Sequence, residues 1–224
     1  ITSSANATAI TIDATENIGI GVVPEDWHSA YDGGIVQINS HGAIFSQGAE
    51  TYLTNNVYEP QSGGMKYINT NVATLYSQQT GIHHFKTAVS GSADAAITWI
   101  DAMTIKADGK VGIGTGSPTG NSKVHIYNAA SGQSSSNNNT ELVIENDNNT
   151  GIQFLTPNNK ISGLWFGDSD DTQVGRLYYS HSDNSLNVVT DNTQRIRIDS
   201  DGIKFNADTA AANALDDYEE GTWT

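Results

Sequence analysis

The stretch AITIDATENIGIG (residues 9–21) recurs in this sequence as AMTIKADGKVGIG (102–114) and, in a more divergent form, as RIRIDSDGIKF (195–205). The three copies align, with a constant spacing of 93 residues, on Ile12, Ile105 and Ile198. A fixed period over two steps predicts an internal repeat in which each copy is one supersecondary unit.

Each copy has the pattern of a tight β-hairpin. Apolar and polar residues alternate, a polar group such as Asp108-Gly109 interrupts them, and the alternation then resumes. The glycines of VGIG (111–114) also raise the alternative of a phosphate-binding loop. Such a loop needs a helix that begins at its last glycine, whereas Pro118 follows here. We therefore interpret these glycines as strand positions at which two backbones approach closely.

Composition limits the classes of partner. The chain has 224 residues, 25 acidic against 10 basic, and a net charge of −15, so nucleic acid and anionic membranes are unfavourable partners. No run of about 18 apolar residues is present, so we expect no membrane insertion. Charged residues make up 16% of the chain, below the roughly 25% of ordinary soluble domains. Asn, Ser, Thr and Gly take their place, which favours turns and sheet surfaces.

Cysteine is absent, which excludes disulfides and thiolate metal sites. The sequence begins at Ile1, without methionine or a signal peptide, and ends at Thr224. We expect a piece of a longer, extracellular protein.

Short alternating segments bounded by Gly, Asn, Asp or Pro run through the chain and predict an all-β architecture. The clearest hairpin joins 177–179 to 186–188 through the turn 181–184, and another strand is expected at 151–156. The polar segment 129–140 predicts a loop. An alanine-rich segment, 208–218, predicts a short C-terminal helix capped by Asp208.

The period divides the chain into a first hairpin (1–21), two repeat modules (22–114 and 115–207) and a linker (208–224) to a further domain. Each strand has only two or three large apolar residues on one face, and a single such hairpin is not stable in water. We therefore expect obligate association between chains, for example three copies around a common axis.

Longer motifs carry a family resemblance. FGDSDDTQVGRLYYSHSDNSLNVVTDNTQRIRIDSDG (166–202) resembles a repeat module of bacteriophage tail fibres and related virion appendage proteins. VVPEDWHSAY, TYLTNNVY, MKYIN, AAITWIDAMTIKADGKVGIGTGSP and ALDDYEEGTWT are similar to segments of the same family in the same order. The third hairpin departs from the pattern, because Ile203-Lys204-Phe205 follows its turn in place of GIG.

The resemblance implies an elongated, intertwined homotrimeric fibre of β-hairpin modules on a virion. Such a fibre would have a structural role and would mediate or support attachment to the host cell surface. It would not be an enzyme. Expected partners are identical copies, other tail or appendage proteins and a host surface glycan. No cofactor is expected.

Two other functions remain open. One is a spike that degrades polysaccharide, which needs two carboxylates about 5 to 10 Å apart. The acid pairs Glu25-Asp26 and Asp216-Asp217 do not by themselves supply this pair, because neighbours on a strand face opposite ways. The other is a bacterial surface adhesin built from similar repeats.

Candidate metal ligands are the carboxylates of Asp168, Asp170 and Asp171, which suit Ca²⁺ but also suit an acidic turn. His83 and His84 are adjacent in an expected strand, so their rings point to opposite faces, and on a threefold axis His83 would appear three times. No metal site is predicted from either group.

Four aromatic residues invite two interpretations. As exposed rings they would stack on sugars, and as rings on a sheet face they would fill a core between chains. They are Trp27, Tyr31, Tyr52 and Tyr58.

Overall fold

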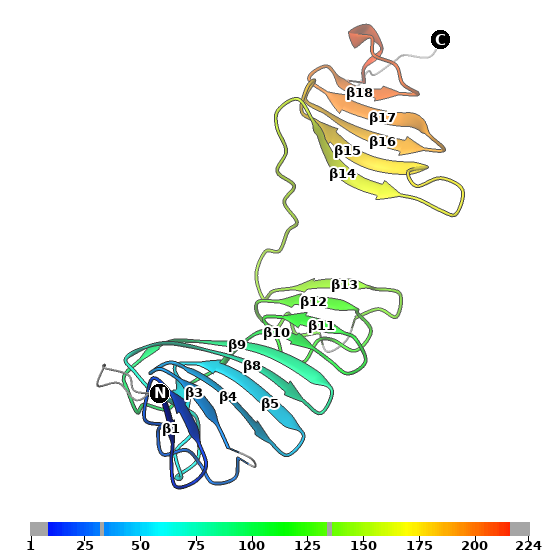
Figure 1. Ribbon diagram of the computed structural model, residues 1–224. Coiled ribbons are helices and arrows are strands. Elements are labelled where there is room, and N and C mark those ends of the chain that lie inside the picture. The colour runs from blue at the N-terminus through cyan, green and yellow to red at the C-terminus, as the bar shows by residue number, and fades with distance from the viewer. Residues whose placement is uncertain (1–8, 32–33, 134–135, 216–224) are drawn as a thin grey trace, which may run out of the picture. The chain divides into compact units, whose positions relative to one another are not determined.

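The computed structural model describes residues 9–31, 34–133 and 136–215. The chain divides into two compact units, Ile1–Thr150 and Gly151–Thr224 (Figure 1). Apart from one turn of 3-10 helix, every regular element in the described residues is a β-strand, which confirms the all-β class. No helix in these residues is long and apolar enough to cross a membrane.

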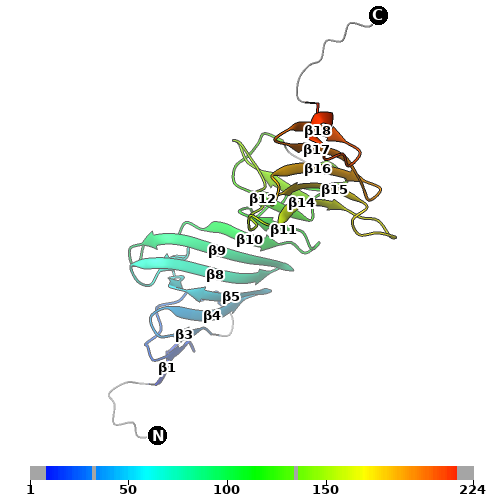
Figure 2. The ribbon, with the colours of Figure 1, turned by 90° about the horizontal axis from the view of Figure 1, so that it is seen from above.

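Unit 1 is built on an eleven-stranded sheet in the order β1-β2-β3-β4-β5-β8-β9-β10-β11-β12-β13. Figure 2 shows strands β3, β4, β5, β8 and β9 side by side in that order. Pairing is parallel at β2–β3, β11–β12 and β12–β13, and antiparallel elsewhere. The strand bounds are β1 Ile10–Ile12, β2 Ile18–Ile20, β3 Val36–Ile38, β4 Gly42–Gln47, β5 Glu50–Asn55, β8 Asn71–Gln79, β9 Ile82–Gly91, β10 Ile100–Ile105, β11 Val111–Ile113, β12 Val124–Tyr127 and β13 Leu142–Glu145.

Unit 2 contains a five-stranded antiparallel sheet in the order β14-β15-β16-β17-β18. The strand bounds are β14 Ile161–Phe166, β15 Gly175–Ser180, β16 Ser185–Thr190, β17 Thr193–Asp199 and β18 Gly202–Phe205. The turn 181–184 joins β15 to β16, as the sequence predicts.

The three related stretches each form an antiparallel hairpin, as predicted. The turn spans five residues in the first two hairpins, which pair Ile12 with Ile18 and Ile105 with Val111. In the third hairpin Ile198 pairs with Ile203, and Asp199 pairs with Gly202 across a two-residue turn. The shorter turn accounts for the altered sequence after it.

The glycines of the GIG motif lie beneath a crossing loop. A Cβ at Gly112 would lie 2.5 Å from the carbonyl oxygen of Thr115 and 3.4 Å from Cδ of Pro118. A Cβ at Gly19 would meet Val22 and Pro24 in the same way. After the loop the chain forms the next strand, β3 in the first case and β12 in the second. This strand pairs in parallel with β2 or β11, respectively. This geometry confirms the interpretation as sites of close backbone approach.

One face of the unit 1 sheet carries an aromatic core. Trp27 is 2% exposed and packs against Tyr31, Phe45 and Tyr58, with ring centroids 5.1 to 6.4 Å apart. Buried Gln37 fixes the crossing segment, because its Oε1 accepts hydrogen bonds from the Trp27 indole and from the backbone of Glu25. The core cluster comprises Trp27, Tyr31, Ile35, Ala43, Phe45, Tyr52, Tyr58 and Leu75.

Both interpretations of the four aromatic residues are therefore wrong. All four are buried in the chain's own core and are neither exposed nor shared between chains. The physical reason is that segments 21–35 and 56–70 supply Trp27, Tyr31 and Tyr58 to the same cluster as strands β4, β5 and β8. A second cluster, Val57, Tyr67, Ala73 and Ala88, extends this core through the two-stranded ribbon of β6 (Val57–Tyr58) and β7 (Lys66–Tyr67).

Two predicted elements differ from the structure. Residues 151–156 form no strand, although Ile152 and Phe154 alternate with polar residues, because no strand pairs with this segment. The expected helix at 208–218 is reduced to a 3-10 turn, η1 (Ala211–Asn213), and residues 216–218 lie outside the described part. Asp208 does accept the backbone N–H of Ala210 at 2.9 Å, as a capping residue would. The boundary between the units, at Thr150, also lies inside the second sequence module.

Candidate functional site

The uncovered face of the unit 1 sheet carries an unbroken apolar row. Residues paired directly across strands share a face, so the strand registers place one apolar side chain from each of the eleven strands in line. We call this line the apolar row. Its members are Ile12, Ile18, Val36, Ile44, Leu53, Tyr76, Phe85, Met103, Ile113, Ile126 and Ile144.

The apolar row is open to solvent in the isolated chain. Leu53 is 53% exposed and Ile12 is 68% exposed, whereas the neighbours of Leu53 on the other face, Tyr52 and Thr54, are buried. A flanking row adds Ile105, Val111, Val124 and Leu142 on the same face. Strands lie about 4.8 Å apart and same-face residues of one strand about 6.7 Å apart, so one row over eleven strands and a flanking row over four strands cover on the order of 500 Å². This area lies within the range of the largest apolar patch of a typical monomer, about 300 to 600 Å², which is often functional.

The sheet of unit 2 repeats this arrangement. Its first row is formed by Leu164, Leu177, Val188, Ile196 and Phe205, paired in that order. A second row on the same face is formed by Tyr179, Leu186, Ile198 and Ile203. Leu164, Leu177 and Phe205 are exposed. Each unit thus presents one apolar sheet face that its own described residues leave uncovered.

The opposite face of unit 2 carries charged and polar side chains beside the apolar Ile161, Trp165 and Val189. Asp199 accepts hydrogen bonds from Arg197 Nε at 2.7 Å and from Lys204 Nζ at 2.9 Å, and Lys204 also contacts Asp201. The adjacent Arg197 guanidinium, and then Lys204, hold the pKa of the Asp199 carboxyl well below its usual range. Arg197 also reaches Asp183 at 3.0 Å. This network fixes the side chains of β17 and β18 on that face.

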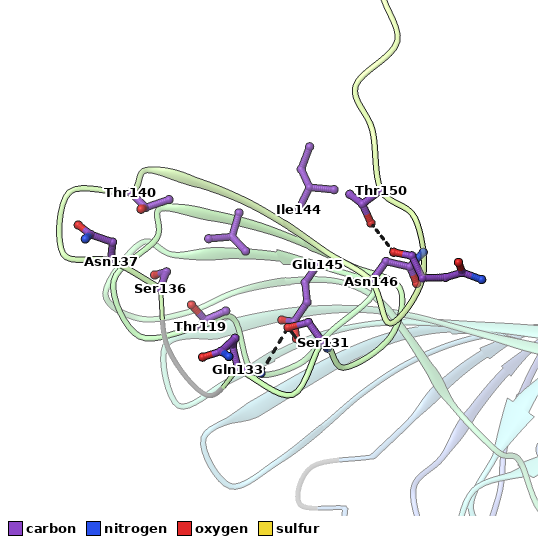
Figure 3. A pocket seen from close by; sticks show the side chains of 12 residues that line it. Thr119, Ser131, Gln133, Ser136, Asn137, Thr140, Ile144, Glu145, Asn146 and Thr150 are labelled. Carbon is purple, nitrogen blue, oxygen red and sulfur yellow. Dashed lines mark hydrogen bonds between the residues drawn. The ribbon is translucent and has the colours of Figure 1, made fainter.

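A second polar region surrounds Glu145 at the end of the unit 1 sheet (Figure 3). Glu145 Oε1 accepts from the backbone N–H and the hydroxyl of Ser131, and these bonds lower its pKa. Its Oε2 lies 3.0 Å from Nε2 of buried His125, whose Nδ1 accepts the backbone N–H of Thr119. Hydroxyls and amides line a hollow of about 410 Å³ here.

This Ser-Glu-His arrangement is not that of a nucleophilic site. Ser131 donates its hydroxyl to Glu145, whose lowered pKa makes the carboxylate a weak base, and no histidine contacts this hydroxyl among the described residues. His125 is 2% exposed, and the N–H of Thr119 occupies its Nδ1 while Glu145 faces its Nε2. The cluster therefore anchors the loop after β12 to the sheet.

Three tyrosine hydroxyls at the edge of the aromatic core each donate to a carboxylate. Tyr58 donates to Asp94 at 2.6 Å and Tyr31 to Glu59 at 2.5 Å, while Tyr52 donates to Glu50. Burial, and then the hydrogen bond to Asp94, raise the pKa of Tyr58 to about 12. These carboxylates therefore serve as hydrogen-bond acceptors for the core.

The candidate acidic residues have structural partners. Asp168 Oδ1 accepts the backbone N–H groups of Asp170 and Asp171, each at 2.9 Å, and Asp171 accepts from Asn192. Among residues 9–31, 34–133 and 136–215, no group of three or more His, Asp or Glu side chains is arranged to hold a metal ion. Burial, together with nearby Asp94, raises the pKa of Glu25. Asp216 and Asp217 lie outside the described residues.

His83 and His84 point to opposite faces, as predicted. His83 pairs with Ile105 on the uncovered face and is 2.8 Å from the hydroxyl of Tyr76. His84 lies on the other face beside Ser77 and Thr104, and burial lowers its pKa.

Neither the apolar row nor the charged network of unit 2 was predicted residue by residue. The alternation in each strand was visible, but only the registers align the strands. One signal was present in the sequence: all three arginines of the chain, Arg176, Arg195 and Arg197, fall within one hairpin region. No protein-family model matches this chain, and none of the curated proteins matches it.

Proposed function

We propose that this chain is a structural segment of a tail-fibre-like virion appendage, in which identical copies associate through their uncovered apolar faces. The observation that carries the proposal is the apolar row, which crosses all eleven strands of unit 1. A monomer would leave this row in water at a cost proportional to its area. Burial of this patch in each of three copies removes on the order of 1,500 Å² from water, the size class of specific, stable interfaces.

Three further features support assembly over an isolated monomer. Unit 2 has its own uncovered apolar rows, so both units would contribute to the same kind of contact. The chain lacks cysteine, and its own core covers only one face of the unit 1 sheet. The resemblance of 166–202 to tail-fibre modules favours a threefold, intertwined and elongated arrangement, with attachment to the host surface as its role.

Light scattering combined with small-angle X-ray scattering tests this proposal. We expect about 71 kDa, three times the 23.8 kDa of one chain, and a radius of gyration above the roughly 26 Å of a compact trimer. A folded particle of about 24 kDa with a radius near 17 Å would contradict it. A mass of two chains would retain the apolar contact but contradict the threefold arrangement. Sequencing of the flanking genes separates a virion protein, expected beside capsid and tail genes, from a bacterial adhesin.

A further inference from the structure

The polar face of the unit 2 sheet contains a hollow of about 250 Å³ that the assembly does not use. It lies along the face of β14 that carries Ile161 and Trp165, with Gly163 between them. The backbone of Tyr178 approaches Gly163 so closely that a Cβ there would lie 2.6 Å from its Cα. The hollow is also lined by Arg176, Asn187 and Arg197.

The corresponding face of unit 1 is covered by the chain, whereas the described residues of unit 2 leave this face open. The order β14-β15-β16-β17-β18 matches β5-β8-β9-β10-β11 pair by pair, so Trp165 corresponds to buried Thr54 and Arg176 to buried Leu75. In the described part of unit 2, the three-residue η1 is the one regular element outside the single sheet. Trp165 is consequently 45% exposed.

Two polar groups in the hollow lack a hydrogen-bond partner. Asn187 is 1% exposed, and its amide donates to the backbone and hydroxyl oxygens of Ser185, but its Oδ1 has no donor among the described residues. The buried Nε of Arg176 has no acceptor there either. An unsatisfied buried polar atom is costly, so a ligand that supplies both partners gains affinity.

Arg176 differs from the other cations of this face. Arg197 and Lys204 each contact two carboxylates, whereas no carboxylate lies within 4 Å of Arg176 among the described residues. Its side chain donates one hydrogen bond in that part of the chain, at 3.4 Å to Gln173, and beyond 4 Å its charge acts on the carboxylate of Asp171. An arginine with free donors favours a carboxylate, which its planar fork binds in a bidentate manner. The net charge of −15 opposes the approach of an anionic ligand, so the attraction comes from this local contact.

We infer that this hollow binds a sugar ring that carries a carboxylate, as in the uronic acid residues of an acidic polysaccharide. The carboxylate pairs with Arg176, and the exposed indole of Trp165, the register partner of Arg176, offers a flat apolar surface to the C–H face of the ring. The acceptors Asn187 Oδ1 and Asp183 take hydroxyl donors from the sugar. One apolar surface with a few convergent polar groups is typical of small-ligand sites.

This inference rests on the proposed attachment role and names the class of ligand that would be bound. Its test does not depend on whether the chains assemble. The hollow lies on the face opposite the apolar rows, so association through those rows leaves it open. Failure of the assembly would appear as a change in mass, and failure of the site as a loss of ligand binding in a particle of unchanged mass.

Saturation-transfer NMR and calorimetry on the full chain test the inference, with tetragalacturonate as the probe and maltotetraose as the neutral comparison. We expect saturation transfer to tetragalacturonate, little to maltotetraose, and a loss of affinity of about tenfold or more in Arg176→Gln and in Trp165→Ala. The matched control is Arg195→Gln, because it removes the same charge from β17 outside the hollow. It should change affinity less than twofold.

Several outcomes would overturn the inference. These are no saturation transfer, equal binding of maltotetraose, equal binding of tetraglutamate, or the same loss in Arg195→Gln as in Arg176→Gln. Circular dichroism and light scattering verify that each variant keeps its fold and mass. If Trp165→Ala does not fold, Trp165→Phe replaces it, and this variant should bind more weakly while Arg176→Gln still abolishes the preference for the acidic sugar.

Discussion

Leu53 lies at the middle of the apolar row, and its replacement by aspartate would disrupt the proposed assembly without disturbing the core. Its side chain is 53% exposed, so about half of it remains to be buried, which corresponds to about 1 kcal/mol per chain. An aspartate would lose this contribution and bury a carboxylate without a partner, at about 2 kcal/mol or more per chain. Over three chains the loss is on the order of 10 kcal/mol, or about seven orders of magnitude in the association constant.

Light scattering at micromolar concentration measures this effect directly. We expect Leu53→Asp to have the mass of one chain, while its circular dichroism and the fluorescence of buried Trp27 stay those of a folded unit 1. The matched control is Val23→Asp, which introduces the same charge at a 71% exposed position in the loop between β2 and β3. If Leu53→Asp keeps the full oligomer mass, or if Val23→Asp dissociates it equally, the apolar row is not the contact surface.

Three further predictions concern the stability of unit 1. Phe45→Ala removes the ring between Trp27 and Tyr52, and should lower the free energy of unfolding by about 3 to 5 kcal/mol in urea titrations, whereas exposed Phe154→Ala should have little effect. Because the pKa of Tyr58 is raised from 10.0 to about 12, its stabilisation is fully present below pH 10 and is lost as pH rises through 12. Tyr58→Phe should flatten this loss in denaturation measured from pH 9 to 12, and an unchanged slope would contradict the assignment. Gly112→Ala places a Cβ 2.5 Å from a backbone carbonyl and should cost about 1 to 3 kcal/mol, while Gly120→Ala, with open space around it, should be neutral in the same titration.

The hairpins were predictable from the sequence because their signals are local. Alternation over three to six residues and a polar turn are sufficient to place strands such as β15 and β16, and the turn 181–184 falls where it was expected. The same local signal failed at 151–156, where Ile152 and Phe154 alternate with polar residues but no neighbouring strand provides hydrogen bonds. A strand is defined by its partner, and the partner is not part of the local pattern.

The covering of one sheet face was not predictable because it depends on long-range contacts. Trp27 reaches its core position through Gln37, ten residues further along the chain, and Tyr58 through Asp94, 36 residues away. From composition alone these aromatics were equally consistent with sugar stacking or an interchain core. The alignment of the apolar row likewise depends on the registers of ten strand pairs, none of which the sequence states.

The two sheets show how one pairing scheme supports two uses. Leu53, Tyr76 and Phe85 in unit 1 correspond in register to Leu164, Leu177 and Val188 in unit 2, so the same face stays apolar in both.

The other face differs in chemistry between the two units. In unit 1 a segment of the chain crosses this face, and the face carries Phe45, Tyr52 and Leu75, which that segment shields from water. Where no described segment crosses it, the face carries arginines, an asparagine and an indole, which are compatible with water. If both faces served only assembly, the second would have no reason to keep, among the described residues, Arg176 without a carboxylate within 4 Å and Asn187 Oδ1 without a donor. A binding role for that face accounts for both.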